Sequence, residues 1–261
     1  MTWAHKRQMI YLLISLIILG GTVFYFFVYP YINVAPTCSD GKQNGTEGGV
    51  DCGGACSLQC SYEVDKVSTL WSRSFEVVPG RYNAVAYLEN NNTNTVINKI
   101  SYKFRFADKD NLYIGKRDGS TFIPAGGRFA IFEPAIDLGS SVPVYTTFEF
   151  SEIPVWYKVP TEKMDQLKIF VSDISLEDED TSPKLQAKIK NNSFFIIPEV
   201  SIVAILYDEE GNAINVSQTY VDSLQAEESK NIVFTWPEAF GKKVISKEII
   251  PMYNVFLTKL K

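Results

Sequence analysis

The chain has 261 residues and a formal net charge of −5, from 30 acidic and 25 basic residues. This acidic balance argues against nucleic acid or an anionic lipid headgroup as the main partner, because both attract basic surfaces. With 46% hydrophobic and 13% aromatic residues, the chain has enough apolar surface for one large domain or two ordinary ones.

The first predicted element is the uncharged segment of residues 9–29. A helix needs about 20 consecutive apolar residues to cross the hydrocarbon core of a bilayer, and this segment is about that long. Lys6 and Arg7 precede it, and the next charged residue is Asp40. Because basic residues stay on the cytoplasmic side, we expect residues 1–8 to form a cytoplasmic tail. The segment itself is then a single-pass anchor in the cell membrane, and the rest of the chain is extracytoplasmic.

A cleaved signal peptide is the alternative interpretation of the same segment. Signal peptides carry an apolar region of about 7–15 residues, followed by a cleavage site between small residues. The segment here is longer, and the nearest candidate site, at Ala35, has Asn33 where a small residue is expected. The sequence therefore favours an uncleaved anchor.

All four cysteines lie in residues 30–66, which we expect to form a membrane-proximal stalk. They fall within a segment that we call the cysteine knuckle, residues 38–60, and are Cys38, Cys52, Cys56 and Cys60. The knuckle has too few apolar side chains to form a core. Clustered cysteines outside the cytoplasm form disulfides, so we predict that these four pair among themselves. Three pairings are open, and a zinc site is the alternative.

The knuckle also places four oxygen-bearing side chains among glycines: Asp40, Asn44, Glu47 and Asp51. Oxygen ligands on a flexible loop suit Ca²⁺, although the spacing is not that of an EF-hand. Two interpretations stay open, a polar spacer held by disulfides and a spacer that also binds calcium. No other cofactor is expected.

The cysteine and acidic residues of the knuckle follow the pattern C-x-D-G-x2-N-G-x-E-x-G-x-D-C-G-G-x-C. This pattern resembles a short cysteine-rich motif of bacterial surface and secreted proteins, often found beside a membrane anchor or between domains. The resemblance implies an envelope setting and no activity.

From about residue 67 the chain repeats itself at a spacing near 100 residues. The corresponding stretches are Glu-Asn-Asn-Asn-Thr at 89–93 with Lys-Asn-Asn-Ser at 190–193, and Ile-Ser-Tyr-Lys-Phe-Arg-Phe-Ala-Asp at 100–108 with Val-Ser-Ile-Val-Ala-Ile-Leu-Tyr-Asp at 200–208. A repeat of this length indicates a duplicated domain rather than a solenoid, whose units have about 20–50 residues.

The repeat aligns Asn91 with Asn191 and Asp108 with Asp208. We predict one domain at 67–160 and a second at 161–261, with the boundary near the proline and polar residues that follow residue 158.

Alternating side chains predict the strands of both domains. Tyr102, Phe104 and Phe106 are separated by polar residues, which is typical of a strand with one buried face. Asp108 and Asp208 begin turns that tolerate a left-handed backbone. Several such strands per domain predict an all-β fold, with two tandem antiparallel immunoglobulin-like β-sandwiches behind one N-terminal transmembrane helix.

The strand that ends in aspartate resembles the signature of FxLyD-type immunoglobulin-like envelope domains. It reads Phe-Arg-Phe-Ala-Asp at 104–108 and Ala-Ile-Leu-Tyr-Asp at 204–208. The resemblance implies a seven-strand sandwich without catalytic residues, serving adhesion, assembly or spacing.

No catalytic arrangement is visible in the predicted exterior. The single histidine, His5, lies before the anchor, so a nucleophile activated by histidine cannot form outside. Trp71, Trp156 and Trp236 are expected in cores or on sheet faces rather than as sugar platforms.

We therefore predict a non-enzymatic envelope protein that acts in binding, assembly or structural spacing. Its partners are the lipid bilayer and, as we expect, other envelope proteins, while the sequence names no small-molecule ligand. Two alternatives are an accessory subunit of a membrane transport or secretion complex and a carbohydrate-active enzyme.

Overall fold

The computed structural model describes residues 3–29 and 38–260 of the chain. About half of the residues are in strands, all the sheets are antiparallel, and one long helix stands at the N-terminus. The predicted fold class, all-β with one apolar N-terminal helix, is confirmed.

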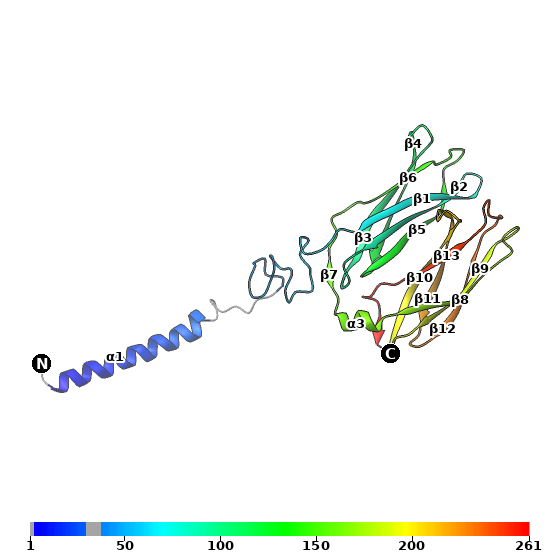
Figure 1. The fold of residues 1–261 in the computed structure, drawn as a ribbon. Coiled ribbons are helices and arrows are strands. Elements are labelled where there is room, and N and C mark those ends of the chain that lie inside the picture. The colour runs from blue at the N-terminus through cyan, green and yellow to red at the C-terminus, as the bar shows by residue number, and fades with distance from the viewer. Residues whose placement is uncertain (1–2, 30–37, 261) are drawn as a thin grey trace.

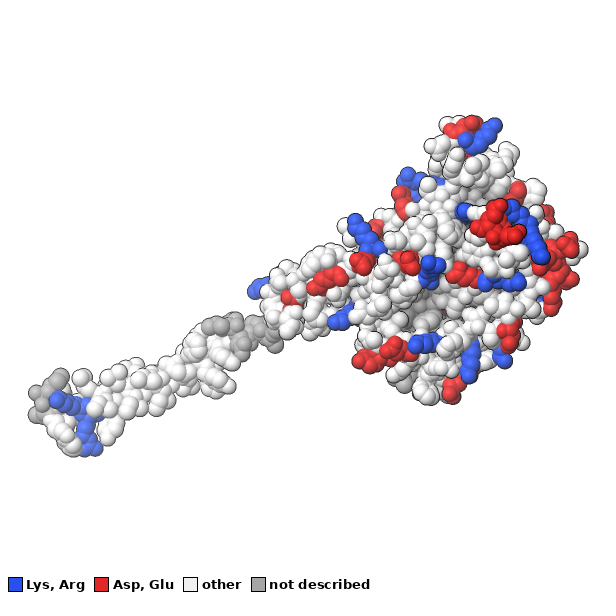
Figure 2. All heavy atoms as spheres, viewed as in Figure 1, with Lys and Arg blue, Asp and Glu red and all other residues white. Residues whose placement is uncertain are grey.

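Helix α1 (Trp3–Val23) continues into a π-helical turn, η1 (Phe24–Val28). Together they span 26 residues and contain an 18-residue window with a mean hydropathy of 2.3, enough to cross a bilayer by length and composition. None of their side chains is buried by the β-sheet body, and Figure 1 shows α1 outside it. Figure 2 shows basic side chains at the N-terminal end of this helix and none along the rest of it.

The first half of the body consists of two sheets packed face to face. One has the order β1 (Ser68–Val78), β2 (Arg81–Asn90) and β5 (Gly127–Asp137), and the other has β4 (Tyr113–Ile123), β3 (Thr95–Ala107) and β6 (Tyr145–Phe150). A short strand, β7 (Tyr157–Lys158), pairs with the start of β3. Tyr102, Phe104 and Phe106 of β3 all point into the core, as their alternation predicts.

The second half repeats this strand order after the short helix α3 (Thr161–Gln166). One sheet has β8 (Ile169–Glu177), β9 (Lys184–Asn191) and β12 (Ser229–Thr235), and the other has β11 (Ala213–Leu224), β10 (Phe195–Tyr207) and β13 (Ser246–Met252). Strand β14 (Lys259–Leu260) pairs with the start of β10, as β7 pairs with β3.

The two halves pack against each other through the sheet of β1, β2 and β5 and the sheet of β11, β10 and β13 (Figure 1). The central strands β2 and β10 are buried on both faces. In β10, Val203 and Ile205 belong to the core of the first half, whereas Ile202, Ala204 and Leu206 belong to the core of the second. The sequence predicted two separate sandwiches, but the structure joins them through a common apolar layer.

The aspartates of the repeat have the same task in both halves. The Asp108 carboxylate accepts the backbone N–H groups of Asp110 and Leu112, and Asp208 accepts those of Glu210 and Asn212. The fourth residue of each turn, Asn111 or Gly211, has a left-handed backbone, as the sequence predicts. The aspartate that ends the repeated strand is therefore a turn cap.

The predicted alignment of Asn91 with Asn191 is wrong by one residue. Asn90 and Asn191 are both fully buried at the end of a strand, and each donates to the carbonyl of the first residue of the next strand, Thr95 or Phe195. Asn91 is exposed. The connection after β2 is one residue longer than the one after β9, which a comparison of letters in an asparagine-rich stretch cannot detect.

Candidate functional site

The cysteine knuckle contains two disulfides, Cys38–Cys56 and Cys52–Cys60. They close segments with sequence separations of 18 and 8 residues. The four cysteines pair among themselves, as predicted, and none remains free. Because zinc binds thiolates rather than disulfide sulfurs, this pairing leaves no cysteine ligand for the zinc alternative.

The predicted calcium ligands lie together in the knuckle and bond to its backbone. The carboxylate of Asp51 accepts N–H groups of Asp40 and Gly41, and Glu47 Oε2 accepts that of Asn44 at 3.0 Å. Asn44 Nδ2 donates to Asp40 Oδ2 at 2.8 Å. These bonds hold the glycine-rich loops in place, and calcium binding stays a prediction.

The knuckle is attached to the first half of the body. Leu58 forms a β-bridge with Tyr157. On either side, the N–H of Gln59 donates to the Trp156 carbonyl at 2.9 Å, and the N–H of Lys158 donates to the Ser57 carbonyl at 2.7 Å. The expectation that disulfides alone order the knuckle as a spacer is therefore wrong, because its end extends the sheet beside β7.

A second attachment follows a few residues later. The N–H of Asp65 donates to Asn92 Oδ1 at 2.9 Å, and Asn92 Nδ2 donates to the Asp65 carbonyl at 2.8 Å. Asn92 also bonds to the buried Asn90. The segment between the knuckle and β1 is thus tied to the connection between β2 and β3.

Between these attachments lies an open groove, which we call the base groove. It lies between the segment that precedes β1, the start of β3 and the loop that follows β6, and has a volume of about 410 Å³. Its lining is mostly apolar and consists of Val64, Val67, Ile97, Ile100, Phe150, Ile153, Pro154 and Trp156, with Ser61, Asp65 and Lys66. Such a volume is within the usual range for a binding site, about 300–1,000 Å³.

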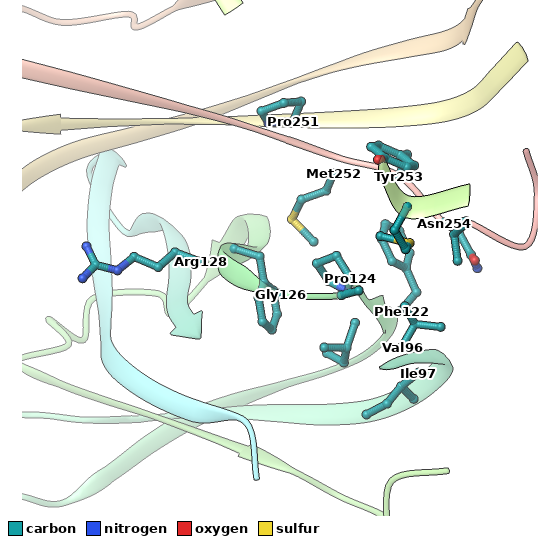
Figure 3. Close-up of a pocket in the computed structure, with 15 residues that line it drawn as sticks. Val96, Ile97, Phe122, Pro124, Gly126, Arg128, Pro251, Met252, Tyr253 and Asn254 are labelled. Atoms are coloured by element: carbon teal, nitrogen blue, oxygen red, sulfur yellow. The ribbon is translucent and has the colours of Figure 1, made fainter. Parts of the chain in front are cut away.

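A smaller cavity of about 150 Å³ lies between the two halves. Figure 3 shows Met252 pointing from the second half toward Pro124 of the first, while the guanidinium group of Arg128 points away. The walls include Phe122, Phe129 and Met164. Since it is well below the size of ordinary ligand sites, we interpret it as a packing gap in the interface.

A half-buried acid, Glu248, connects the two halves beside this interface. The hydroxyls of Tyr87 and Tyr207 both donate to the carboxylate of Glu248, at 2.6 and 2.8 Å. Burial, together with the carboxylate of Glu248, raises the pKa of Tyr87 to about 12. Burial and the same carboxylate also raise the pKa of Tyr207.

Sequence reasoning missed both this bridge and the base groove. A signal for the interface is present in the uninterrupted apolar runs at 84–88 and 202–206, which are typical of strands buried on both faces. The expected tryptophans behave as predicted, since Trp156 and Trp236 are buried and Trp71 packs against the ring of Tyr87.

No known protein family and no curated protein matches this sequence. Among solved structures, a transglutaminase from red sea bream is similar at 9% identity with a TM-score of 0.23, covering 72% of this chain and 31% of the other. A Bacteroides uniformis β-glucuronidase is similar at 11% identity with a TM-score of 0.21, covering 68% of this chain and 26% of the other. The chain thus spans about a third of these proteins or less, and the resemblance is too distant to support an argument about function.

Proposed function

We propose that this protein is a single-pass membrane protein with a non-enzymatic β-sheet body that binds other proteins of the cell envelope. The observation that carries the proposal is an apolar helix of 26 residues that the body leaves entirely uncovered. Such a long run of exposed apolar side chains is unfavourable in water, and the interior of a bilayer would shield it from water.

The side of the membrane follows from the charges and the cysteines. Lys6 and Arg7 support a cytoplasmic N-terminus. The two disulfides support an extracytoplasmic location for the knuckle, since disulfides persist in oxidising compartments. The repeated strand order supports two copies of one immunoglobulin-like domain, with 67–160 and 161–261 as the proposed bounds.

The binding role rests on the rigid attachment of the knuckle and on the base groove beside it. Backbone hydrogen bonds fix the body to the knuckle, so the base groove and the knuckle form one continuous surface. The carbohydrate-active and accessory-subunit alternatives remain predictions from the sequence alone.

Intact mass spectrometry of the protein extracted from membranes tests the anchor. We expect the mass to include the N-terminal helix, whereas loss of about the first 30 residues would support a cleaved signal peptide. Protease treatment of intact cells or spheroplasts then tests the orientation. Digestion of the body from outside is expected, and full protection of residue 261 would contradict the proposal.

A further inference from the structure

The two halves of the body close their equivalent ends in different ways. In the second half, the loop between β13 and β14 carries Val255, whose side chain is 5% exposed. In the first half, the corresponding loop between β6 and β7 carries Ile153, which is 85% exposed at the mouth of the base groove. The apolar side chain at this position is covered in the second half and exposed in the first.

The cover of the second half is the segment that precedes β8. Met164 of α3 and Leu167 pack into the second core, where Leu167 is 3% exposed. Lys163 Nζ donates to the Val255 carbonyl at 3.1 Å, and the Tyr253 hydroxyl donates to the Leu167 carbonyl at 2.6 Å. A single helical turn with apolar side chains three residues apart therefore closes this end.

In the first half, the segment that precedes β1 covers its end less completely, and Ile153 stays exposed. Its start is held beside β7 by the knuckle, and Asp65 is held by Asn92. Val64 and Val67 pack against the first core but stay partly exposed, and they form one wall of the base groove. Apolar side chains of the first core, including Ile97 and Ile100, line the bottom.

We propose that the base groove binds a short apolar segment of another envelope polypeptide, which closes the first half as α3 closes the second. This inference rests on the proposed extracytoplasmic location and adds the site and the chemistry of the partner. The segment presents apolar side chains three or four residues apart on one face, the spacing that a helical turn brings together.

The charges around the groove favour a peptide over lipid. Of the described residues that line it, only Asp65 and Lys66 are charged, and they are of opposite sign. Anionic lipid surfaces attract clusters of basic residues, and the groove has none. Its near-neutral rim complements an uncharged segment, and its concave shape fits side chains better than a flat bilayer.

Photo-crosslinking from position 153 tests the proposal. The full chain carrying p-benzoylphenylalanine in place of Ile153 is reconstituted in nanodiscs and irradiated with solubilised envelope from cells that make the protein. The matched control carries the same group in place of Leu112, an exposed residue in the turn between β3 and β4. We expect an adduct with one polypeptide from position 153 only, mapped by mass spectrometry to a segment with the proposed apolar spacing.

A synthetic peptide of the mapped segment then supplies the decisive measurement. It should bind the full chain saturably, and Ile153→Asp should weaken binding at least about tenfold, because the complex would bury an unpaired charge. Since Ile153 is exposed in the free protein, this change should leave folding intact. Leu112→Asp should leave binding unchanged.

Three outcomes would overturn the proposal. They are an adduct with phospholipid or with a second copy of the chain, equal labelling from both positions, and peptide binding that Ile153→Asp does not weaken. The protease experiment separates this result from the proposed function. A body found in the cytoplasm would refute the location whatever the groove binds, whereas an extracytoplasmic body without a groove ligand would refute only the site.

Discussion

The two halves of the body share their strand order and their turn chemistry, but their ends differ. Both have an aspartate-capped turn after the third strand and a buried asparagine at the end of the second. They differ where the preceding segment meets the sandwich. Leu167 is buried at one end, whereas the segment before β1 covers the other end only in part and leaves Ile153 exposed. The alternation of apolar residues thus specifies the sheets. The segment that precedes each domain determines how much of the apolar surface at its end stays exposed to solvent.

The largest expected effect on stability comes from a test of whether the two halves unfold independently. Ile205→Asp places a charge in the layer that joins them, where Ile205 is fully buried. An unpaired buried charge is expected to lower the free energy of unfolding by about 4 kcal/mol or more. We expect both halves to lose stability together in urea unfolding of the full chain.

Ile174→Asp is the matched control, because Ile174 is exposed on the outer strand β8. Its effect should be within about 0.5 kcal/mol. Two resolved transitions, only one of them shifted by Ile205→Asp, would show that the halves unfold separately.

Reduction of the disulfides tests whether they order the knuckle alone or the body as well. Each disulfide should contribute about 2–4 kcal/mol to the order of the loop that it closes. Hydrogen exchange should therefore accelerate in residues 38–60 after reduction, and also at 156–158, which bond to the knuckle. Residues 184–235 of the second half should keep their exchange rates.

Equal acceleration in the second half would contradict this local role. A calcium chelator added to the oxidised protein extends the same measurement. If the predicted calcium site exists, exchange at residues 40–51 should accelerate, and an unchanged rate would argue against that site.

Substitution of the two buried asparagines compares the stability contribution of equivalent positions in the two halves. Asn90→Ala and Asn191→Ala each remove an amide that bonds to backbone carbonyls, and should lower the free energy of unfolding by about 2–3 kcal/mol. The Nδ2 group of Asn191 lies within hydrogen-bond distance of three carbonyl oxygens, one of which must share a hydrogen, and that of Asn90 of two, so Asn191→Ala should have the larger effect.

Asn91→Ala and Asn192→Ala serve as controls, because both residues are exposed. Denaturant unfolding should show changes within about 0.5 kcal/mol for each. A large loss for Asn91→Ala with a small one for Asn90→Ala would favour the alignment that the structure corrects.

The smallest expected effect is the pH dependence of stability that arises from the tyrosines bonded to Glu248. The pKa of Tyr87 is raised from 10.0 to about 12 in the folded protein. Between these values the folded state binds more protons than the unfolded state, so stability should fall as the pH rises through this range. Below about pH 10 the contribution should be fully present.

Melting temperatures measured between pH 8 and 12 test this sign for the full chain. Tyr87→Phe should make the alkaline fall less steep. Tyr113→Phe should leave the curve unchanged, since Tyr113 is exposed. An identical slope for both variants would show that Tyr87 does not contribute.

The sequence by itself determined the features that depend on neighbouring residues. These features include the apolar helix and the pairing of the cysteines among themselves. They also include the alternation of Tyr102, Phe104 and Phe106 in β3 and the turns at Asp108 and Asp208. Each follows from local periodicity, turn chemistry or the clustering of one residue type.

Only the tertiary structure decided how these parts meet. It selected one of the three possible cysteine pairings, Cys38–Cys56 with Cys52–Cys60. It also placed Leu58 beside Tyr157 and joined Tyr87 to Glu248. Sequence separation does not predict which of these residues are close in space. The base groove has the same origin. Ile153 and Val255 occupy similar loops, and their exposure differs because one neighbouring segment folds over its loop while the other is bonded elsewhere.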